Sequence, residues 1–263
     1  MTGAIWLIGG THESRWIADC ILSQGFSCWV SVTTAAAAGL YPAHPLLTCH
    51  VERLTPERAR KLIQQHSIQG IVDASHPFAA AVSALAIRLS QELGLPYLRF
   101  ERPDLPQTTG IYTDLPALLR SNLLVGERVL LTLGVKLLAA FAPLQGQATL
   151  FARILPTVTA LETALAARFD RRRLIAIFPP VSQELERALW QQWQITTVVT
   201  KASGTAGEQI KQTLARELGV KLITLRRPPI SYPRQTSDRA GIEAFLQELA
   251  TSRQSDRLLP PDY

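Results

Sequence analysis

Short polar segments that follow apolar runs carry the residues best suited to chemistry. Residues 73–78 read DASHPF, and His76 within them could bind a carboxylate or donate a proton. A lone histidine is also a common capping or packing residue, so a purely structural role stands beside the catalytic one. Lys201, in the segment TKASG, suits contact with an anion, although a solvated lysine beside a helix cap is the alternative. No G-x-S-x-G segment is present, so nothing indicates a serine hydrolase.

A glycine pair follows the first apolar run, in the segment GGTHES at 9–14. Glycine lets the backbone approach a phosphate closely, and the free N–H groups that begin a helix attract anions. We therefore predict a nucleotide site here, although the segment is neither G-x-G-x-x-G nor a P-loop. The alternative is an ordinary tight turn in which Thr11 caps the helix. The cofactor-binding candidates in this turn are Gly9, Gly10, Thr11, His12 and Glu13.

The second apolar run ends in hydroxyl side chains, and no Asp or Glu occurs between Phe26 and Thr48. NAD-binding folds usually place an acidic residue there to hold the ribose 2′-hydroxyl. Its absence favours NADPH as the cofactor, with NADH still possible, because a carboxylate would repel the 2′-phosphate. The candidates are Ser31, Thr33 and Thr34, and the alternative is that they simply end a strand.

Composition excludes several function classes. The 263 residues carry a net charge of +6, which suits an anionic partner. The basic clusters are short and lack interleaved aromatic residues, so we do not expect nucleic acid binding. No run of about 18 apolar residues indicates a membrane span, and MTGAIWLIGG lacks the features of a signal peptide, so we expect a cytoplasmic protein.

The cysteines and histidines do not form a metal motif. Cys20, Cys28 and Cys49 show no C-x-x-C spacing, and their number is odd. We expect reduced, buried thiols and no protein-bound metal, because no second His or Cys lies at ligand spacing from His76.

Apolar strand patterns alternate with helical patterns, which predicts parallel sheets covered by helices. The first-half strands are expected at Ile5–Ile8, Cys28–Thr33, His50–Glu52, Gly70–Asp73 and Pro96–Phe100. The second-half strands are expected at Gly110–Tyr112, Arg128–Leu133, Ala148–Ile154, Leu174–Phe178, Thr196–Thr200 and Lys221–Leu225. The helices with recognisable ends are Glu13–Ser23, Pro56–Gln65 after the cap Thr55, Pro77–Leu93 between the cap Ser75 and Gly94, and Asp238–Thr251.

A linker-like segment, ERPDLPQTTG at 101–110, divides this alternation. We therefore predict an α/β protein with two tandem Rossmann-like domains, 1–104 and 105–251, with parallel sheets and an interdomain cleft. Residues 252–263 are expected to form a disordered tail. Ligands of open parallel sheets bind beyond the carboxyl ends of the strands, which is where the polar segments fall.

These motifs together resemble one family, the precorrin-6A reductases of cobalamin biosynthesis. The likeness covers about residues 4–245 and is most specific where DASHPF precedes PYLRFERP at 96–103. The other matching segments are IGGTHESR at 8–15, LTLG at 131–134, RILP at 153–156, VTKASG at 199–204, ARELGV at 215–220 and LRRP at 225–228.

The resemblance implies a two-domain reductase that uses a reduced nicotinamide to reduce a double bond of precorrin-6A or cobalt-precorrin-6A, giving precorrin-6B. It implies no flavin and no catalytic metal. The substrate is a polycarboxylated tetrapyrrole, which fits the basic charge. Matching motifs add Ser75, His76, Pro77 and Phe78 to the cofactor site. The substrate-binding candidates are Gly134, Lys136, Arg153, Lys201, Ser203 and Gly204.

The sequence also departs from that family. Pro179 and Pro180 stand where the family usually has glycine and proline, which stiffens the loop and removes an N–H group. Ala202 and Thr205 replace the family's preferred residues in K-x-S-G-G. Two other readings therefore stay open: another tetrapyrrole-modifying enzyme such as a methyltransferase, and a non-catalytic tetrapyrrole-binding protein. A monomer or a small homo-oligomer is expected.

Overall fold

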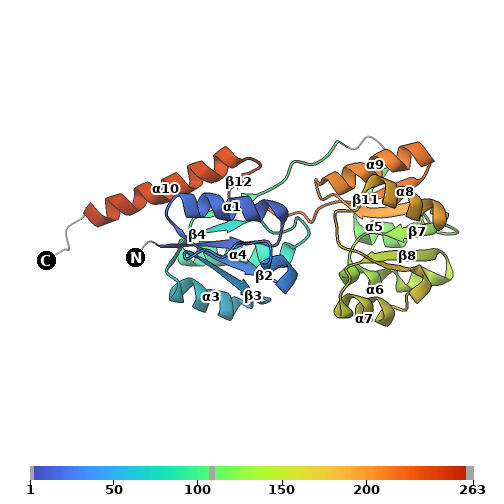
Figure 1. The fold of residues 1–263 in the computed structure, drawn as a ribbon, viewed down its shortest axis with the longest axis horizontal. Helices are drawn as coiled ribbons and strands as arrows, with labels where there is room; N and C mark the ends of the chain where they lie inside the picture. Colours follow the sequence, from blue (N-terminus) through green and yellow to red (C-terminus); the bar gives the residue numbers. More distant parts are fainter. Residues whose placement is uncertain (1–2, 107–109, 259–263) are drawn as a thin grey trace. The chain divides into compact units, whose positions relative to one another are not determined.

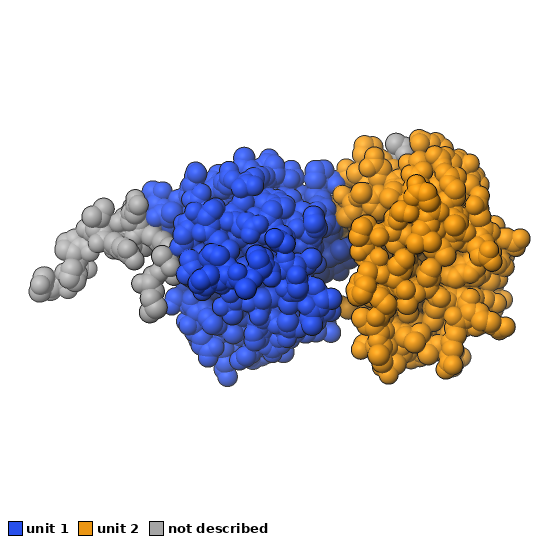
Figure 2. Space-filling view, viewed as in Figure 1, with its two compact units in different colours: residues 1–103, 228–263 blue, residues 104–227 orange. Residues whose placement is uncertain are grey.

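The computed structural model describes residues 3–106 and 110–258, and it divides the chain into two compact units (Figure 2). Unit 1 comprises Met1–Pro103 and Pro228–Tyr263, and unit 2 comprises Asp104–Arg227. The predicted boundary after residue 104 lies one residue from this division. The prediction that 105–251 forms one domain differs from it, because 228–251 belongs to unit 1.

The sheet of unit 1 has six parallel strands in the order β12-β5-β4-β1-β2-β3. This is the strand order of doubly wound dinucleotide-binding folds. The strands are β1 (Ala4–Ile8), β2 (Ser27–Val32), β3 (Leu47–Val51), β4 (Ile68–Asp73), β5 (Tyr97–Phe100) and β12 (Gln235–Thr236). The helices are α1 (His12–Ser23), α2 (Ala35–Ala38), α3 (Pro56–Gln65), α4 (Ala80–Leu93) and α10 (Arg239–Leu258).

Helices cover both faces of this sheet, so its central strand is apolar throughout. Ile5 and Leu7 of β1 pack in a cluster with residues of α1 and α10. Trp6 points to the opposite face, where it packs with residues of α3 and α4. Alternate side chains of a strand point to opposite faces, and both clusters exclude water, which explains the continuous apolar run AIWLI.

The return of the chain to unit 1 follows from the apolar face of α10, which lies along α1 (Figure 1). Ile242, Phe245 and Leu246 are at most 1% exposed and complete the core of unit 1. Helix α10 packs closely on β4, since a Cβ on Gly70 would lie 2.8 Å from Leu249. The helix continues to Leu258, so 252–258 do not form the predicted disordered tail, and 259–263 lie outside the described residues.

Strand β12 was not predicted, because its two residues, Gln235 and Thr236, form no apolar pattern. It pairs with β5 through backbone hydrogen bonds: Arg99 N donates to Arg234 O (2.9 Å) and Glu101 N to Thr236 O (2.8 Å). Tertiary pairing, and not local propensity, makes this segment a strand.

The sheet of unit 2 is also parallel and has the order β6-β11-β10-β7-β8-β9. Five of its strands repeat the order of unit 1, and β6 takes the position that β12 has there. The strands are β6 (Ile111–Thr113), β7 (Arg128–Leu131), β8 (Thr149–Ile154), β9 (Leu174–Ala176), β10 (Thr197–Lys201) and β11 (Lys221–Leu225). The helices are α5 (Leu115–Arg120), α6 (Leu138–Phe141), α7 (Val158–Ala166), α8 (Gln183–Gln192) and α9 (Ala206–Leu218), with short 3₁₀ turns η1 (Val135–Leu137), η2 (Ala142–Gly146) and η3 (Arg171–Arg173).

The two sheets confirm the predicted α/β class and its parallel strands. Each sheet completes its sixth position with a strand from a distant part of the chain, so the units are not simple tandem repeats. The cleft expected between the units stays a prediction. Within 3–106 and 110–258, no helix has the length and apolarity needed to cross a membrane.

Candidate functional site

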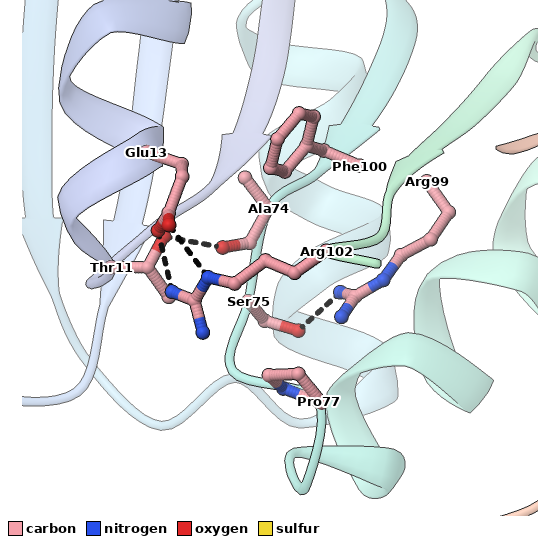
Figure 3. Close-up of a pocket in the computed structure, with 8 residues that line it drawn as sticks. All are labelled: Thr11, Glu13, Ala74, Ser75, Pro77, Arg99, Phe100 and Arg102. Carbon is pink, nitrogen blue, oxygen red and sulfur yellow. Dashed lines mark hydrogen bonds and ion pairs between the residues drawn. The ribbon is translucent and has the colours of Figure 1, made fainter. Parts of the chain in front are cut away.

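The strand order of unit 1 reverses between β1 and β4, and the loops that follow these strands meet there. Such a switch point is where open parallel sheets bind ligands. Thr11 Oγ1 donates to the carbonyl of Ala74 (2.8 Å) and joins the two loops. Figure 3 shows the small pocket at this place. Its lining residues are Thr11, Glu13, Ala74, Ser75, Pro77, Arg99, Phe100 and Arg102.

The glycine turn is held by a tyrosine that the sequence did not reveal. Gly10 has φ +95°, which favours glycine, and its N–H donates to the hydroxyl of Tyr41 (3.0 Å). The same hydroxyl lies 2.5 Å from Ser14 Oγ. Burial raises the pKa of Tyr41, so the phenol stays protonated. The turn is therefore held in place by the protein's own side chains.

Thr11 caps α1 through a capping box with Ser14. Ser14 N donates to Thr11 Oγ1 and Thr11 N donates to Ser14 Oγ, each over 3.2 Å. The alternative reading of Thr11 as a cap is thus correct, and it coexists with the contact to the second loop. His12 is exposed at the first position of the helix, and Glu13 is half-buried at the second.

An arginine from the end of β5 reaches Glu13 across the pocket (Figure 3). Arg102 Nε donates to Oε1 (2.6 Å) and Nη2 to Oε2 (2.5 Å), so the ion pair is bidentate. Burial works to raise the pKa of Glu13, but the hydrogen bonds and charge of Arg102 outweigh it and the pKa is lowered. Glu13 is therefore a carboxylate at neutral pH.

A buried ionic network supports the second loop. The Asp73 carboxylate accepts from Arg99 Nη1 (2.9 Å), Tyr97 Oη (2.9 Å) and the Ser75 backbone N–H (3.0 Å). Arg99 also donates to Ser75 Oγ (3.1 Å) and to Glu101 (2.7 Å). Burial and the charge of Asp73 raise the pKa of Tyr97, so Tyr97 remains a donor. Through Ser75, this network holds the loop that follows β4 in place. The network was not predicted from the sequence.

The predicted start of the following helix is wrong. Helix α4 begins at Ala80, and its N-cap Ala79 makes no side-chain cap. Ser75 is not the cap, because its hydroxyl and its backbone N–H are held by the ionic network. His76 is exposed in the turn before α4, where Nδ1 accepts from Phe78 N (3.2 Å). The structure therefore places Ser75 and Pro77 in the pocket lining, but not His76.

The candidates at the end of β2 separate into two groups. Ser31 is buried, and its hydroxyl accepts from Trp6 Nε1 (2.8 Å), so it serves the core. Thr33 and Thr34 are exposed beyond the strand, and Thr34 Oγ1 caps α2 by accepting from Ala37 N (3.2 Å).

In unit 2 the strand order reverses between β7 and β10. Gly134, with φ +74°, follows β7, and Lys136 lies exposed in the η1 turn that continues from it. Lys201 is the last residue of β10 and is half-buried. Burial, and to a smaller extent the charge of Lys136, lower the pKa of Lys201 to about 8. The two predicted lysines therefore act on each other electrostatically at this switch point.

The other second-unit candidates are engaged within the protein. The backbone N–H groups of Ser203 and Gly204 donate to Glu208 Oε2 (2.7 and 2.9 Å), and this carboxylate is buried. Arg153 is held by the buried carboxylate of Glu186. An internal carboxylate thus occupies the amide groups that could otherwise hold a ligand anion. Thr205 is the N-cap of α9, and its side chain makes no capping hydrogen bond.

A family model described as precorrin-6x reductase CbiJ/CobK matches residues 4–248. The chain belongs to this reductase family. Membership makes it an oxidoreductase.

Two relatives and one solved structure agree with this assignment. A cobalt-precorrin-6A reductase of a Synechocystis species is 49% identical over 249 residues, covering 92% of this chain and 95% of the relative. A precorrin-6A reductase of Rhodococcus erythropolis is 32% identical and covers 93% and 98%. The solved structure of CobK precorrin-6A reductase matches with a TM-score of 0.74 and 23% identity over 95% of this chain and 97% of that one, which shows a shared fold.

In this precorrin-6x reductase family member, the residues of unit 1 fit a nicotinamide nucleotide. The glycine turn is preformed, the switch point has the dinucleotide-binding strand order, and the guanidinium groups of Arg99 and Arg102 line the pocket. Among residues 3–106 and 110–258, no group of three or more His, Cys, Asp or Glu residues is placed to hold a metal ion.

Proposed function

We propose that this chain uses NADPH to reduce a macrocycle double bond of precorrin-6A or cobalt-precorrin-6A in cobalamin biosynthesis, giving precorrin-6B. The observation that carries the proposal is the preformed glycine turn at the switch point of unit 1, in a chain of the precorrin-6x reductase family. The names of the relatives supply the substrate.

Unit 1 is the nucleotide-binding unit in this proposal. The reason is that the loop after β1 in unit 1 differs from the corresponding loop after β7 in unit 2. In unit 1 the loop leads into α1, which has twelve residues and a complete capping box. In unit 2 the corresponding loop leads into the η1 turn, which has three residues and no side-chain cap. A longer helix aligns more peptide dipoles toward a phosphate. The residues that would hold the nucleotide are Gly9, Gly10, Thr11, Ser75, Pro77 and Phe78, and Glu13 lies beside them in the pocket lining.

NADPH is proposed over NADH from the residues that follow β2. Thr33 and Thr34 are exposed there, and no carboxylate occurs between Phe26 and Thr48 to bind a ribose 2′-hydroxyl. Bound reduced nicotinamide would supply the hydride, and the protein would supply placement and charge.

Unit 2 is the substrate-binding unit in this proposal. Lys136 and Lys201 would hold carboxylates of the tetrapyrrole, beside the open Gly134. Arg153, Ser203 and Gly204 support this site indirectly, because internal carboxylates already engage them. His76 stays a proposed proton donor, since it is exposed beside the pocket of unit 1. A His76→Ala variant with unchanged turnover would exclude it from proton transfer.

The deciding experiment measures nicotinamide oxidation with precorrin-6A and with cobalt-precorrin-6A, each with NADPH and NADH. We expect turnover with at least one macrocycle and faster reaction with NADPH. Binding of S-adenosylmethionine without binding of NADPH would point instead to a methyltransferase. Tight macrocycle binding without oxidation of either nicotinamide would indicate a non-catalytic protein.

A further inference from the structure

Two arginines line the pocket of unit 1, and their surroundings differ. Arg99 is 1% exposed and contacts two carboxylates, Asp73 and Glu101. Arg102 is 12% exposed, and its bidentate partner Glu13 is 24% exposed. Breaking a fully buried ion pair leaves a charge uncompensated in the interior, whereas a partly exposed pair costs less to separate. Of these two arginines, Arg102 is the one that can change its partner.

The ion pair with Glu13 must open before Arg102 can bind an anionic ligand. Arg99 contacts two carboxylates, so its guanidinium is already engaged. Glu13 neutralises Arg102 in the conformation described here. An entering nucleotide phosphate would therefore gain the attraction of the Arg102 guanidinium once Arg102 leaves Glu13.

The geometry of Arg102 suits both partners. A guanidinium group presents parallel N–H donors that match a carboxylate or a phosphate equally well. Arg102 already uses Nε and Nη2 in this way on the two oxygens of Glu13. Thr11 and Ser75, from the two loops of the switch point, line the same pocket, so a phosphate bound there would lie within the arginine's surroundings.

We propose that Arg102 exchanges the Glu13 carboxylate for a phosphate of the cofactor, so that Glu13 acts as an internal competitor. The inference rests on the proposed nucleotide site of unit 1. Glu13 then weakens cofactor binding and speeds release of the oxidised nucleotide, while Arg102 is a binding residue. The sequence places the two residues 89 positions apart, and the fold brings them together at the switch point.

The test is a titration of the full chain with NADPH and with NADP⁺, for wild type, Glu13→Gln, Arg102→Met and the double variant. Glutamine keeps the size and one acceptor of Glu13 but lacks its charge. We expect Glu13→Gln to bind about fivefold more tightly, the ratio expected for removing one partly exposed ion pair. Release of NADP⁺ should slow by a similar factor. Arg102→Met should bind at least about tenfold more weakly.

The double variant separates competition from simple charge repulsion. If Glu13 acts by holding Arg102, then Glu13→Gln has little effect on binding once Arg102 is methionine. Arg102→Lys, which keeps the charge but not the fork, replaces Arg102→Met if the latter does not fold. The matched control is Glu57→Gln, which removes the same charge from the same second position of α3, after the cap Thr55. It should bind NADPH like wild type.

The possible results distinguish the proposed exchange at Arg102 from the proposed reductase function. Wild type that binds NADPH, with Glu13→Gln binding equally or more weakly, overturns the exchange and leaves the reductase proposal standing. Wild type that binds no nicotinamide nucleotide overturns both. Equal tightening in Glu57→Gln would show a general effect of net charge, and would also overturn the exchange.

Discussion

The hydroxyl of Tyr41 lies 2.1 Å from the position that a Cβ on Gly9 would take. The glycine pair is therefore required on two counts: Gly10 for its positive φ, and Gly9 for the space that this hydroxyl fills. The tyrosine lies 31 residues beyond Gly10 and turns the glycine turn into a fixed structure.

Gly9→Ala should displace Tyr41 and break its contacts with Gly10 N and Ser14 Oγ. We expect NADPH to bind at least about tenfold more weakly, because the preformed turn is lost. Fluorescence titration with NADPH measures the effect. The double variant Gly9→Ala with Tyr41→Phe should recover part of the affinity, since it removes the clashing oxygen. Unchanged binding by Gly9→Ala would contradict this role of Tyr41.

Arg99→Met should destabilise unit 1 strongly, because it leaves the Asp73 carboxylate buried without its cation. Loss of one partner of a buried pair costs about 3–5 kcal/mol of unfolding free energy. Urea unfolding followed by tryptophan fluorescence measures it. Arg60→Met is the matched control, because Arg60 pairs with Glu92 on the surface and should cost less than about 1 kcal/mol. Equal losses in the two variants would refute the structural importance of the Arg99 network.

Lys201 should give substrate binding a pH dependence. With a pKa of about 8, it is charged below pH 8 and loses its charge above it. If it holds a substrate carboxylate, kcat/KM for the macrocycle should fall as the pH rises through about 8. Lys201→Arg should keep its charge and move the fall to higher pH, because arginine stays protonated. A wild-type profile identical to that of Lys201→Arg would count against the lysine.

The ionised carboxylate of Glu127 should stabilise unit 2, and this stabilisation should be lost at low pH. Its carboxylate accepts from Lys221 Nζ (2.7 Å), from Thr197 Oγ1 (3.0 Å) and from Thr196 Oγ1. Hydrogen bonds from Lys221 and Thr196 lower the pKa of Glu127 below its ordinary value of 4.5. The stabilisation is thus complete above pH 4.5 and disappears as the pH falls through the lowered pKa of the folded state.

Glu127→Gln should therefore lower the unfolding free energy by about 1–2 kcal/mol at neutral pH. The difference from wild type should shrink toward zero in acid. Urea unfolding of both proteins at a series of pH values measures this. A difference that does not change with pH would show that the charge of Glu127 contributes nothing.

Local signals in the sequence were reliable, and long-range ones were not. Helix α3 begins at Pro56 after the cap Thr55, as predicted, because both signals lie within one turn of chain. Gly94 likewise ends α4 with φ +63°, as predicted. The start of α4 was misplaced because Arg99, 24 residues away, takes the Ser75 hydroxyl that was expected to cap the helix.

In the candidate site, too, local features were predicted from the sequence and long-range contacts were not. The polar strand ends were found from sequence, because a parallel sheet collects them at one edge. The side chains that hold them were not found. Arg99 lies within the predicted strand Pro96–Phe100, and nothing local shows that Asp73 and Glu101 flank it. Pairing of Glu13 with Arg102 likewise depends on the completed sheet.

Strand β12 and helix α10 follow unit 2 in the chain but belong to unit 1, and this order has a consequence for synthesis on the ribosome. Residues 104–227 form unit 2 as one continuous segment, so unit 2 can close while the rest of the chain is still being made. Unit 1 begins first but must wait for β12 and α10, whose residues Ile242, Phe245 and Leu246 cover its core. Its apolar sheet face therefore stays open to chaperones or to misassociation until β12 and α10 have been synthesised.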